Sequence, residues 1–219
     1  MDNYPQLDSR LAFAIFAIAA GLLSVLLVAS VGGPPPQAPE ELLRYFVSHR
    51  SAYTFLAITV LAWAVTSVPC IVGLGALLGA RRGALAFAAT LLSAGGVLLL
   101  GFATFAFVGA FLAINASSHT APSQAEAAYQ AAIWSNLSYF LTDPGLMTLG
   151  LGQFLFAWLA WNGGLLPKLL CAIGFVGGLA GLLTLAVYQT GLLALVQISA
   201  FGVWGLASGV LLLTRKEGA

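Results

Sequence analysis

Six long stretches of this 219-residue chain are almost free of charged side chains, and nearly every charge falls in the short gaps between them. Each stretch is close to the length of about 20 apolar residues that a helix needs to cross a bilayer. This layout indicates the environment in which the protein folds, as well as the fold itself. We therefore predict an all-α polytopic membrane protein, with the lipid bilayer as its first partner.

The composition agrees with a bilayer environment. Hydrophobic residues make up 60% of the chain and charged residues 7%, whereas a soluble domain is about 25% charged. An outer-membrane barrel would need strands of about 10 residues that alternate apolar and polar side chains. The runs here are continuous and rich in Ala, Leu and Gly, and the net charge of +1 gives no indication of a nucleic-acid partner.

We expect a single integral membrane domain over residues 1–219, with six transmembrane helices. The first apolar run is long for a signal peptide, whose apolar region spans about 7–15 residues, so we expect it to remain as a helix. Cleavage after Val28-Ala29-Ser30 is the alternative. The six spans are predicted at residues 11–31, 52–78, 84–115, 144–161, 166–188 and 192–213.

Two further segments are predicted to form amphipathic helices on the outer membrane surface. The first covers residues 39–49, where proline and two glutamates open a helix with one apolar face. The second covers residues 124–141, which start with the capping-box pattern Ser123-Gln124-Ala125-Glu126. We expect it to end before Asp143-Pro144, where the N-cap and first position of the next helix are predicted.

The basic residues predict the orientation. Lys and Arg favour the cytoplasmic side of membrane helices. With the N-terminus inside, the inner side carries six basic residues and the outer side only Arg44 and Arg50. The inner set is Arg10, Arg81, Arg82, Lys168, Arg215 and Lys216. We therefore predict an inner (plasma) membrane protein with both termini in the cytoplasm.

The two cysteines are predicted to be free and buried. Cys70 and Cys171 differ in predicted depth by roughly 10 Å, at 1.5 Å of rise per residue. A disulfide needs Cα atoms within about 7 Å of each other.

Small residues are predicted to hold the bundle together, because lipid gives helices little hydrophobic reason to associate. The fifth span has two overlapping GxxxG pairs and the sixth has one. These residues form a candidate packing seam, either between the fifth and sixth spans or toward a homo-oligomer or partner subunit. The seam residues are Gly174, Gly177, Gly178, Gly181, Gly205 and Gly209.

The chemistry that the sequence supports is limited to neutral polar groups. Ionisable residues inside spans usually mark ion paths or proton relays, and none is predicted at depth, which argues against a proton-coupled pump. His49 and His119 lack the spacing of a metal site. We predict no catalytic residue, metal or cofactor. Neutral polar residues at depth form either interhelical hydrogen bonds or a pocket for a neutral ligand: Thr66, Ser67, Thr104, Gln153 and Gln197.

One stretch resembles a known family. The segment from Phe154 to Leu170 has an apolar helix, a short Gly turn at Asn162-Gly163-Gly164, and Leu166-Pro167-Lys168 opening a Gly-rich helix. Together with the turn around Arg81-Arg82, it resembles the bacterial six-helix membrane protein family catalogued as domain of unknown function 4386. The resemblance covers residues 10–188 and implies a six-helix membrane fold without an established activity.

The function that follows is non-enzymatic. We expect an accessory or scaffold subunit that packs against a membrane partner through small-residue faces. The alternative is a carrier or binder of a small neutral or lipid-like molecule. A cavity lined by the neutral polar residues would favour the alternative, and an exposed glycine face would favour the scaffold.

Overall fold

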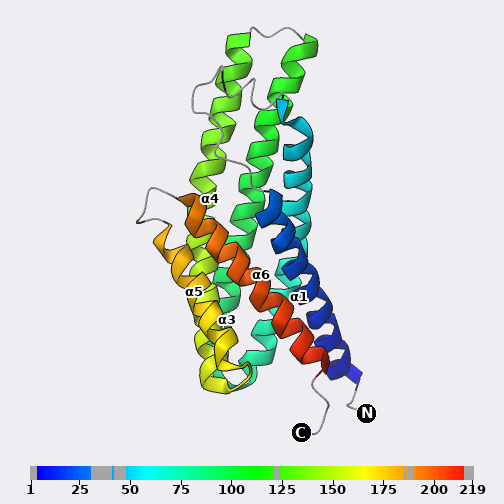
Figure 1. The fold of residues 1–219 in the computed structure, drawn as a ribbon, viewed down its shortest axis with the longest axis vertical. Helices are drawn as coiled ribbons and strands as arrows, with labels where there is room; N and C mark the ends of the chain where they lie inside the picture. Colours follow the sequence, from blue (N-terminus) through cyan, green and yellow to red (C-terminus); the bar gives the residue numbers. More distant parts are fainter. Residues whose placement is uncertain are drawn as a thin grey trace.

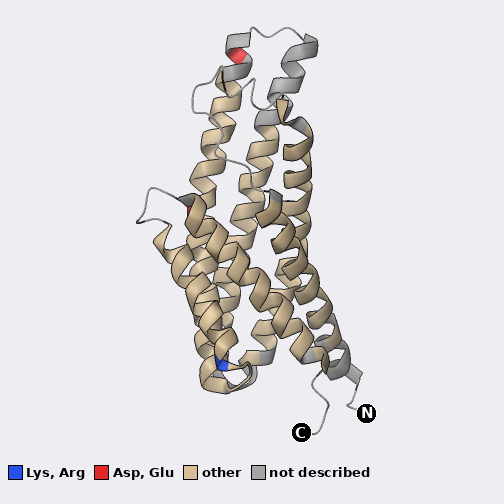
Figure 2. Ribbon diagram, viewed as in Figure 1, with Lys and Arg blue, Asp and Glu red and all other residues tan. Residues whose placement is uncertain are grey.

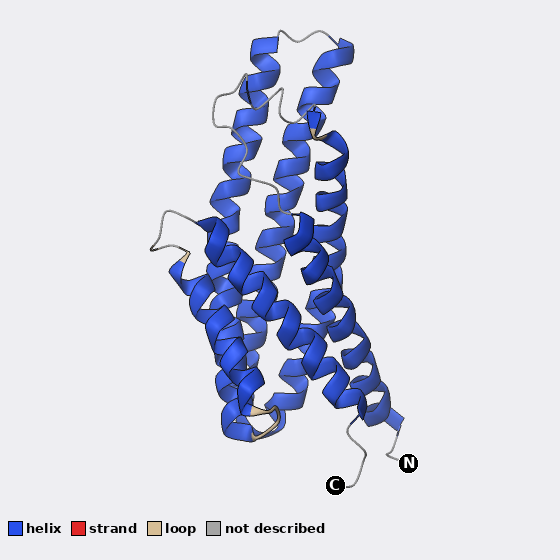
Figure 3. Cartoon of the chain, viewed as in Figure 1, coloured by secondary structure: helices blue, strands red, loops and turns tan. Residues whose placement is uncertain are grey.

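The described part of the chain is all-α in this computed structural model (Figure 3), and it comprises residues 4–30, 41, 48–120, 124–184, 186 and 190–214. The helices are α1 (Tyr4–Ser30), α3 (Arg50–Thr120), α4 (Gln124–Gly163), α5 (Lys168–Leu183) and α6 (Thr190–Thr214). The predicted surface helix over 39–49 lies almost entirely outside the described residues.

Helix α3 is assigned as one element, yet it reverses direction near its middle (Figure 1). Tyr53 near its start contacts Phe107 with ring centroids 5.1 Å apart, and Gly75 faces the Thr90 side chain. α3 is therefore an antiparallel hairpin whose reversal falls at the turn predicted between the second and third spans. Its apolar arms are Ser51–Ala76 and Gly83–Gly109.

The helices form a ring of antiparallel neighbours. α1 packs against α3, α3 against α4, α4 against α5, and α5 against α6. α6 then returns to α1: a methyl group at Gly205 would lie 3.1 Å from the Ala17 carbonyl oxygen, and one at Gly209 would lie 3.0 Å from that of Ala14. The chain thus closes on itself, because its last helix covers its first.

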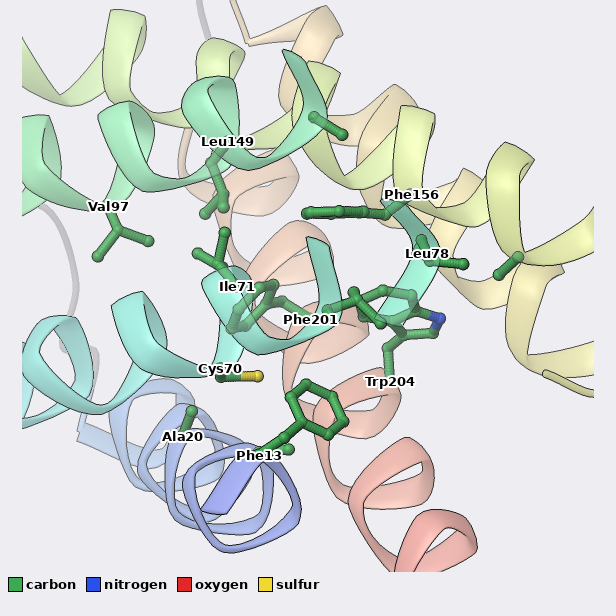
Figure 4. Close-up of a cluster of buried hydrophobic side chains, with 14 of the residues drawn as sticks. Phe13, Ala20, Cys70, Ile71, Leu78, Val97, Leu149, Phe156, Phe201 and Trp204 are labelled. Atoms are coloured by element: carbon green, nitrogen blue, oxygen red, sulfur yellow. The ribbon is translucent and has the colours of Figure 1, made fainter. Parts of the chain in front are cut away.

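The interior of the ring is filled by apolar side chains from α1, α3, α4 and α6 (Figure 4). The Trp63 and Phe201 rings meet edge to face at 5.7 Å, and Phe156 stacks on Trp204 at 6.4 Å. Aromatic pairs in these geometries add to the stabilisation that comes from burial. Cys70 and Cys171 are free and buried in the described structure, as predicted.

The outer faces of the helices are also apolar. Large side chains such as Ile15 on α1, Ile58 and Phe87 on α3, and Leu169 on α5 are exposed. In water, apolar patches of this extent favour aggregation, whereas lipid tails solvate them at no cost. The exposed faces therefore indicate contact with a bilayer.

Within the described residues, three helices are long and apolar enough to cross a membrane: Ser51–Ala76, Gly83–Gly109 and Gly191–Leu211. Two shorter apolar helices accompany them, Phe13–Ala29 and Lys168–Leu183. These candidate spans support a multi-pass membrane protein. The full set of six spans stays a prediction.

Helix α4 corrects one prediction. A separate surface helix over 124–141 is wrong, because α4 runs unbroken through Pro144. A proline removes only one backbone donor, and membrane helices tolerate it when neighbouring groups compensate. The second arm of α3 supports α4 on both sides of this point, with Trp134 packed on Gly109 and Gly145 on Leu100.

The N-terminal half of α4 and the second arm of α3 extend together beyond α5 and α6 (Figure 1). The contacts that join α4 to α5 and α6 lie at Leu146, Gly150, Gln153, Phe154 and Ala157. We call residues 124–143 the α4 extension. Its 20 residues add about 30 Å at 1.5 Å per residue.

Helix α5 is shorter than the span predicted over 166–188. Pro167 occupies its N-cap position with ψ 143°, so the helix begins only at Lys168. At the other end, the Thr184 hydroxyl and backbone N–H both donate to the Gly181 carbonyl, at 2.7 and 3.3 Å. This tight turn ends the helix at Leu183. The predicted span over 192–213 agrees with α6 to within two residues.

Several chain segments that have basic residues in or next to them in the sequence lie at one end of the bundle. The start of α1, the reversal of α3 and the end of α6 share this end (Figure 1). The start of α5 lies there too (Figure 1). Lys168 begins α5 (Figure 2), and its Nζ lies 5.6 Å from the centroid of the Trp161 ring. Glu126 lies in the first turn of α4.

Two adjacent glycines test the close packing of α3 on α4. A side chain at Gly96 would collide with the Gly145 carbonyl oxygen, 2.7 Å away, and with the Leu149 backbone, whereas one at Gly95 meets no described atom within 4 Å. We expect Gly96→Leu to destabilise the protein by about 1–3 kcal/mol through overpacking.

Gly95→Leu is the matched control, since both changes replace a helical glycine by leucine. Thermal unfolding in mild detergent measures the difference. Equal midpoints for the two variants would show that this contact does not hold α3 against α4.

Candidate functional site

Four glycines on one face of α5 are covered by the chain's own helices. A methyl group at Gly174 would lie 2.8 Å from the Ala157 Cβ of α4, and one at Gly178 would lie 2.9 Å from the Gly150 carbonyl oxygen. The same test at Gly177 meets Ala200 of α6 at 2.7 Å. The α5 face of the candidate seam is therefore occupied by α4 and α6.

The other two seam glycines face a different helix. Gly205 and Gly209 on α6 pack against the backbone of α1. They were expected to pair with the fifth span or to face a partner. Their contacts with α1 close the ring instead.

Two of the five neutral polar candidates hydrogen-bond within their own helix. The Thr66 hydroxyl donates to the Ala62 carbonyl at 2.9 Å, and the Thr104 hydroxyl donates to the Leu100 carbonyl at 2.9 Å. Such bonds to the preceding turn satisfy the hydroxyl without a second helix. These two residues therefore bring no unpaired group to the interior.

The other three candidates are buried with unmet hydrogen-bonding groups. Gln197 Nε2 donates to the Leu146 carbonyl at 2.8 Å. Within the described structure, Gln197 Oε1, both amide atoms of Gln153 and the Ser67 hydroxyl have no partner. Gln153 is only 1% exposed.

The structure adds a residue that is not among the five neutral polar candidates. The Trp204 indole Nε1 is buried and also lacks a partner among the described residues. It lies 3.4 Å from the point where a methyl group at Gly174 would stand. Trp204 follows Gln197 by seven residues, which places both on one side of α6, and this spacing is the signal that the sequence offered.

These polar groups form a row along the glycine face of α5. Trp204 Nε1 lies opposite Gly174, Gln153 Nε2 lies 2.6 Å from a methyl position at Gly177, and Gln197 Nε2 lies 2.5 Å from one at Gly181. From Gly174 to Gly181 the row covers about 10 Å at 1.5 Å per residue. We call Gln153, Gln197 and Trp204 the polar row.

A polar contact elsewhere in the bundle provides an acceptor for each of its side-chain hydrogen-bond donors. The Trp63 indole N–H donates to the Ser24 hydroxyl at 2.9 Å, and Ser24 donates to the Ala20 carbonyl at 2.8 Å. Leaving a buried polar group unpaired costs about 1–3 kcal/mol. The polar row carries this cost at several atoms, while the Ser24 site does not.

The polar row carries no formal charge, so the chemistry that it supports is hydrogen bonding to a neutral group. Among the described residues, no three His, Cys, Asp or Glu side chains gather in a way that would hold a metal ion.

A search with protein-family models, a comparison with curated proteins and a comparison with solved structures gave no match to this chain. The family resemblance of the Phe154–Leu170 segment therefore stays a prediction.

The Ser24 contact can be tested with a pair of identical substitutions. Ser24→Ala would leave the Trp63 indole N–H buried without an acceptor, and we expect a loss of about 1–3 kcal/mol of stability.

Ser208→Ala is the control, because Ser208 is also buried but its hydroxyl donates only to carbonyls of its own helix, Trp204 at 2.5 Å and Gly205 at 3.2 Å. Thermal unfolding should separate the two variants by several degrees. If Ser208→Ala destabilises the protein as much, the bond to Trp63 does not stabilise the α1–α3 contact.

Proposed function

We propose that this chain is a non-enzymatic, multi-pass inner-membrane protein that serves as an accessory or scaffold subunit for a membrane partner. The observation that supports this role is an exposed apolar stripe on the α4 extension. It consists of Tyr129, Ile133, Leu137 and Phe140. Tyr129 is 69% exposed and Phe140 is 74% exposed.

We further propose six spans with both termini in the cytoplasm. All neighbouring helices in the ring are antiparallel, which is the order expected when each helix crosses the bilayer in turn. Basic loci at one end of the bundle agree with a cytoplasmic position for that end. α4 needs about 20 residues to cross the hydrocarbon core. Counted back from Gly163, this crossing ends near Pro144.

In this orientation the α4 extension projects from the outer face of the membrane, so lipid tails do not cover the stripe along its whole length. Its residues recur at intervals of four, four and three, which is the spacing of an apolar helix face that docks in a groove. The glycine faces that we expected to serve this purpose are filled by the chain's own helices. The partner surface is therefore assigned to the stripe.

The partner that we propose for the stripe is a different membrane protein. It would present an apolar groove or helix face to Tyr129, Ile133, Leu137 and Phe140.

Charge substitutions on α4 test this surface. Ile133→Arg places a charge in the middle of the stripe, and we expect it to lower recovery of the partner in mild detergent at least tenfold. Asn162→Arg adds the same charge at an exposed position at the far end of the same helix, and it should retain the partner.

A photo-crosslinking amino acid at position 133 identifies what the stripe touches. Capture of a distinct membrane protein is the expected result. Capture of a second copy alone, or equal recovery with both arginine variants, would contradict the proposal.

Cysteine labelling tests the orientation. We place single cysteines at Gln130 and Gly163, both exposed, in a chain whose Cys70 and Cys171 are replaced by alanine. A membrane-impermeant maleimide should label position 130 in intact cells and position 163 only after permeabilisation. Labelling of both positions from the same side would overturn the topology.

A further inference from the structure

We infer that the polar row is a binding site for a small uncharged molecule that carries both a hydrogen-bond donor and an acceptor, such as a primary amide. This site is independent of the partner surface, because it lies between α4, α5 and α6 rather than on the α4 extension. The site consists of two of the neutral polar candidates, Gln153 and Gln197, together with Trp204.

The first support is the pattern of unmet groups. Among the described residues, Trp204 Nε1 and Gln153 Nε2 are donors without an acceptor, and Gln153 Oε1 and Gln197 Oε1 are acceptors without a donor. Side chains that serve only to join helices pair with a neighbouring helix, as Gln197 Nε2 does with the Leu146 carbonyl. Both ends of the Gln153 amide lack such a bond among the described residues, so its donor and its acceptor are both open to a ligand.

The second support is the complementarity of these groups. The two unmet donors match the two lone pairs of one carbonyl oxygen, and the two unmet acceptors match an N–H₂ group. A charged ligand would remain uncompensated here, because Gln and Trp carry no formal charge and burying an unpaired ion is far more costly than burying a neutral group. The row therefore favours a neutral amide or hydroxyl compound over an ion.

The third support is the way the site obtains room. Gly177 and Gly181 have no side chains. The Gln153 amide lies over Gly177 beside the Ala200 Cβ, and the Gln197 amide lies over Gly181 beside the Leu146 carbonyl oxygen. Ala200 and Leu146 stay in place, so a change of rotamer at the two glutamines exposes only the part of the glycine face that their amide ends cover. The neighbouring contacts at Gly174 and Gly178 involve Ala157 and the backbone of α4, which hold the helices in place.

Acetamide is the probe that tests the site, with N,N-dimethylacetamide as a control that lacks the donor and acetate as a charged control. The protein in mild detergent is labelled with ¹⁵N at tryptophan, and the Trp204 indole signal is assigned by its loss in Trp204→Phe. Acetamide should shift this signal saturably in the millimolar range, and both control compounds should shift it at least tenfold less.

Two glutamine variants separate binding from a purely structural role. Gln153→Leu should abolish the acetamide-induced shift of the Trp204 signal without lowering the thermal midpoint. Gln130→Leu, at an exposed position on the same helix, should retain the full shift.

Two results would overturn the proposal. An unsaturable shift, or equal shifts with all three compounds, would show that water alone satisfies the row. A lower midpoint in Gln153→Leu together with an unchanged acetamide shift would show that Gln153 links helices and binds nothing.

Discussion

Close approach of helix backbones at glycine is the interaction on which the rest of this bundle depends. Lipid removes the hydrophobic drive that pulls helices together in water, so packing of small residues must replace it. Most junctions of the ring use this device. Gly21 lies against Leu206 where α1 meets α6, and Gly150 lies against the backbone of Gly181 where α4 meets α5.

This mode of packing explains why the interior has two different characters. On the side of α1 and α3, apolar side chains fill the space inside the ring, and the Trp63 indole N–H finds an acceptor in Ser24. On the side of α5, glycines leave no side chains to fill the space. Polar side chains from α4 and α6 reach into it instead, and several of their atoms remain unpaired among the described residues. The candidate ligand site is thus a consequence of the same glycines that bring the helices close.

The continuity of α4 links the bundle to its proposed partner. Pro144 does not break the helix, because the second arm of α3 runs beside it and packs through Gly109 and Gly96. A rigid two-helix hairpin therefore carries an apolar stripe beyond the end of α5. A flexible or surface-bound segment with the same residues would bury that stripe in the lipid headgroups, and it would leave the protein without an obvious docking surface.

The sequence by itself determined the all-α class, the long apolar helices, the burial of both cysteines and the absence of charge in the predicted spans, because each follows from local composition and from the length of a bilayer crossing. Only the tertiary structure decided that Gly205 faces α1 and that residues 124–141 form one unbroken helix with the rest of α4. It also decided that Gln153 of α4 and Trp204 of α6 lie over the same face of α5. These features depend on contacts between helices that are far apart in the sequence, and the local sequence pattern does not specify them. A GxxxG pattern shows which helix face is small without naming the helix that covers it, and a proline's effect depends on the support beside it.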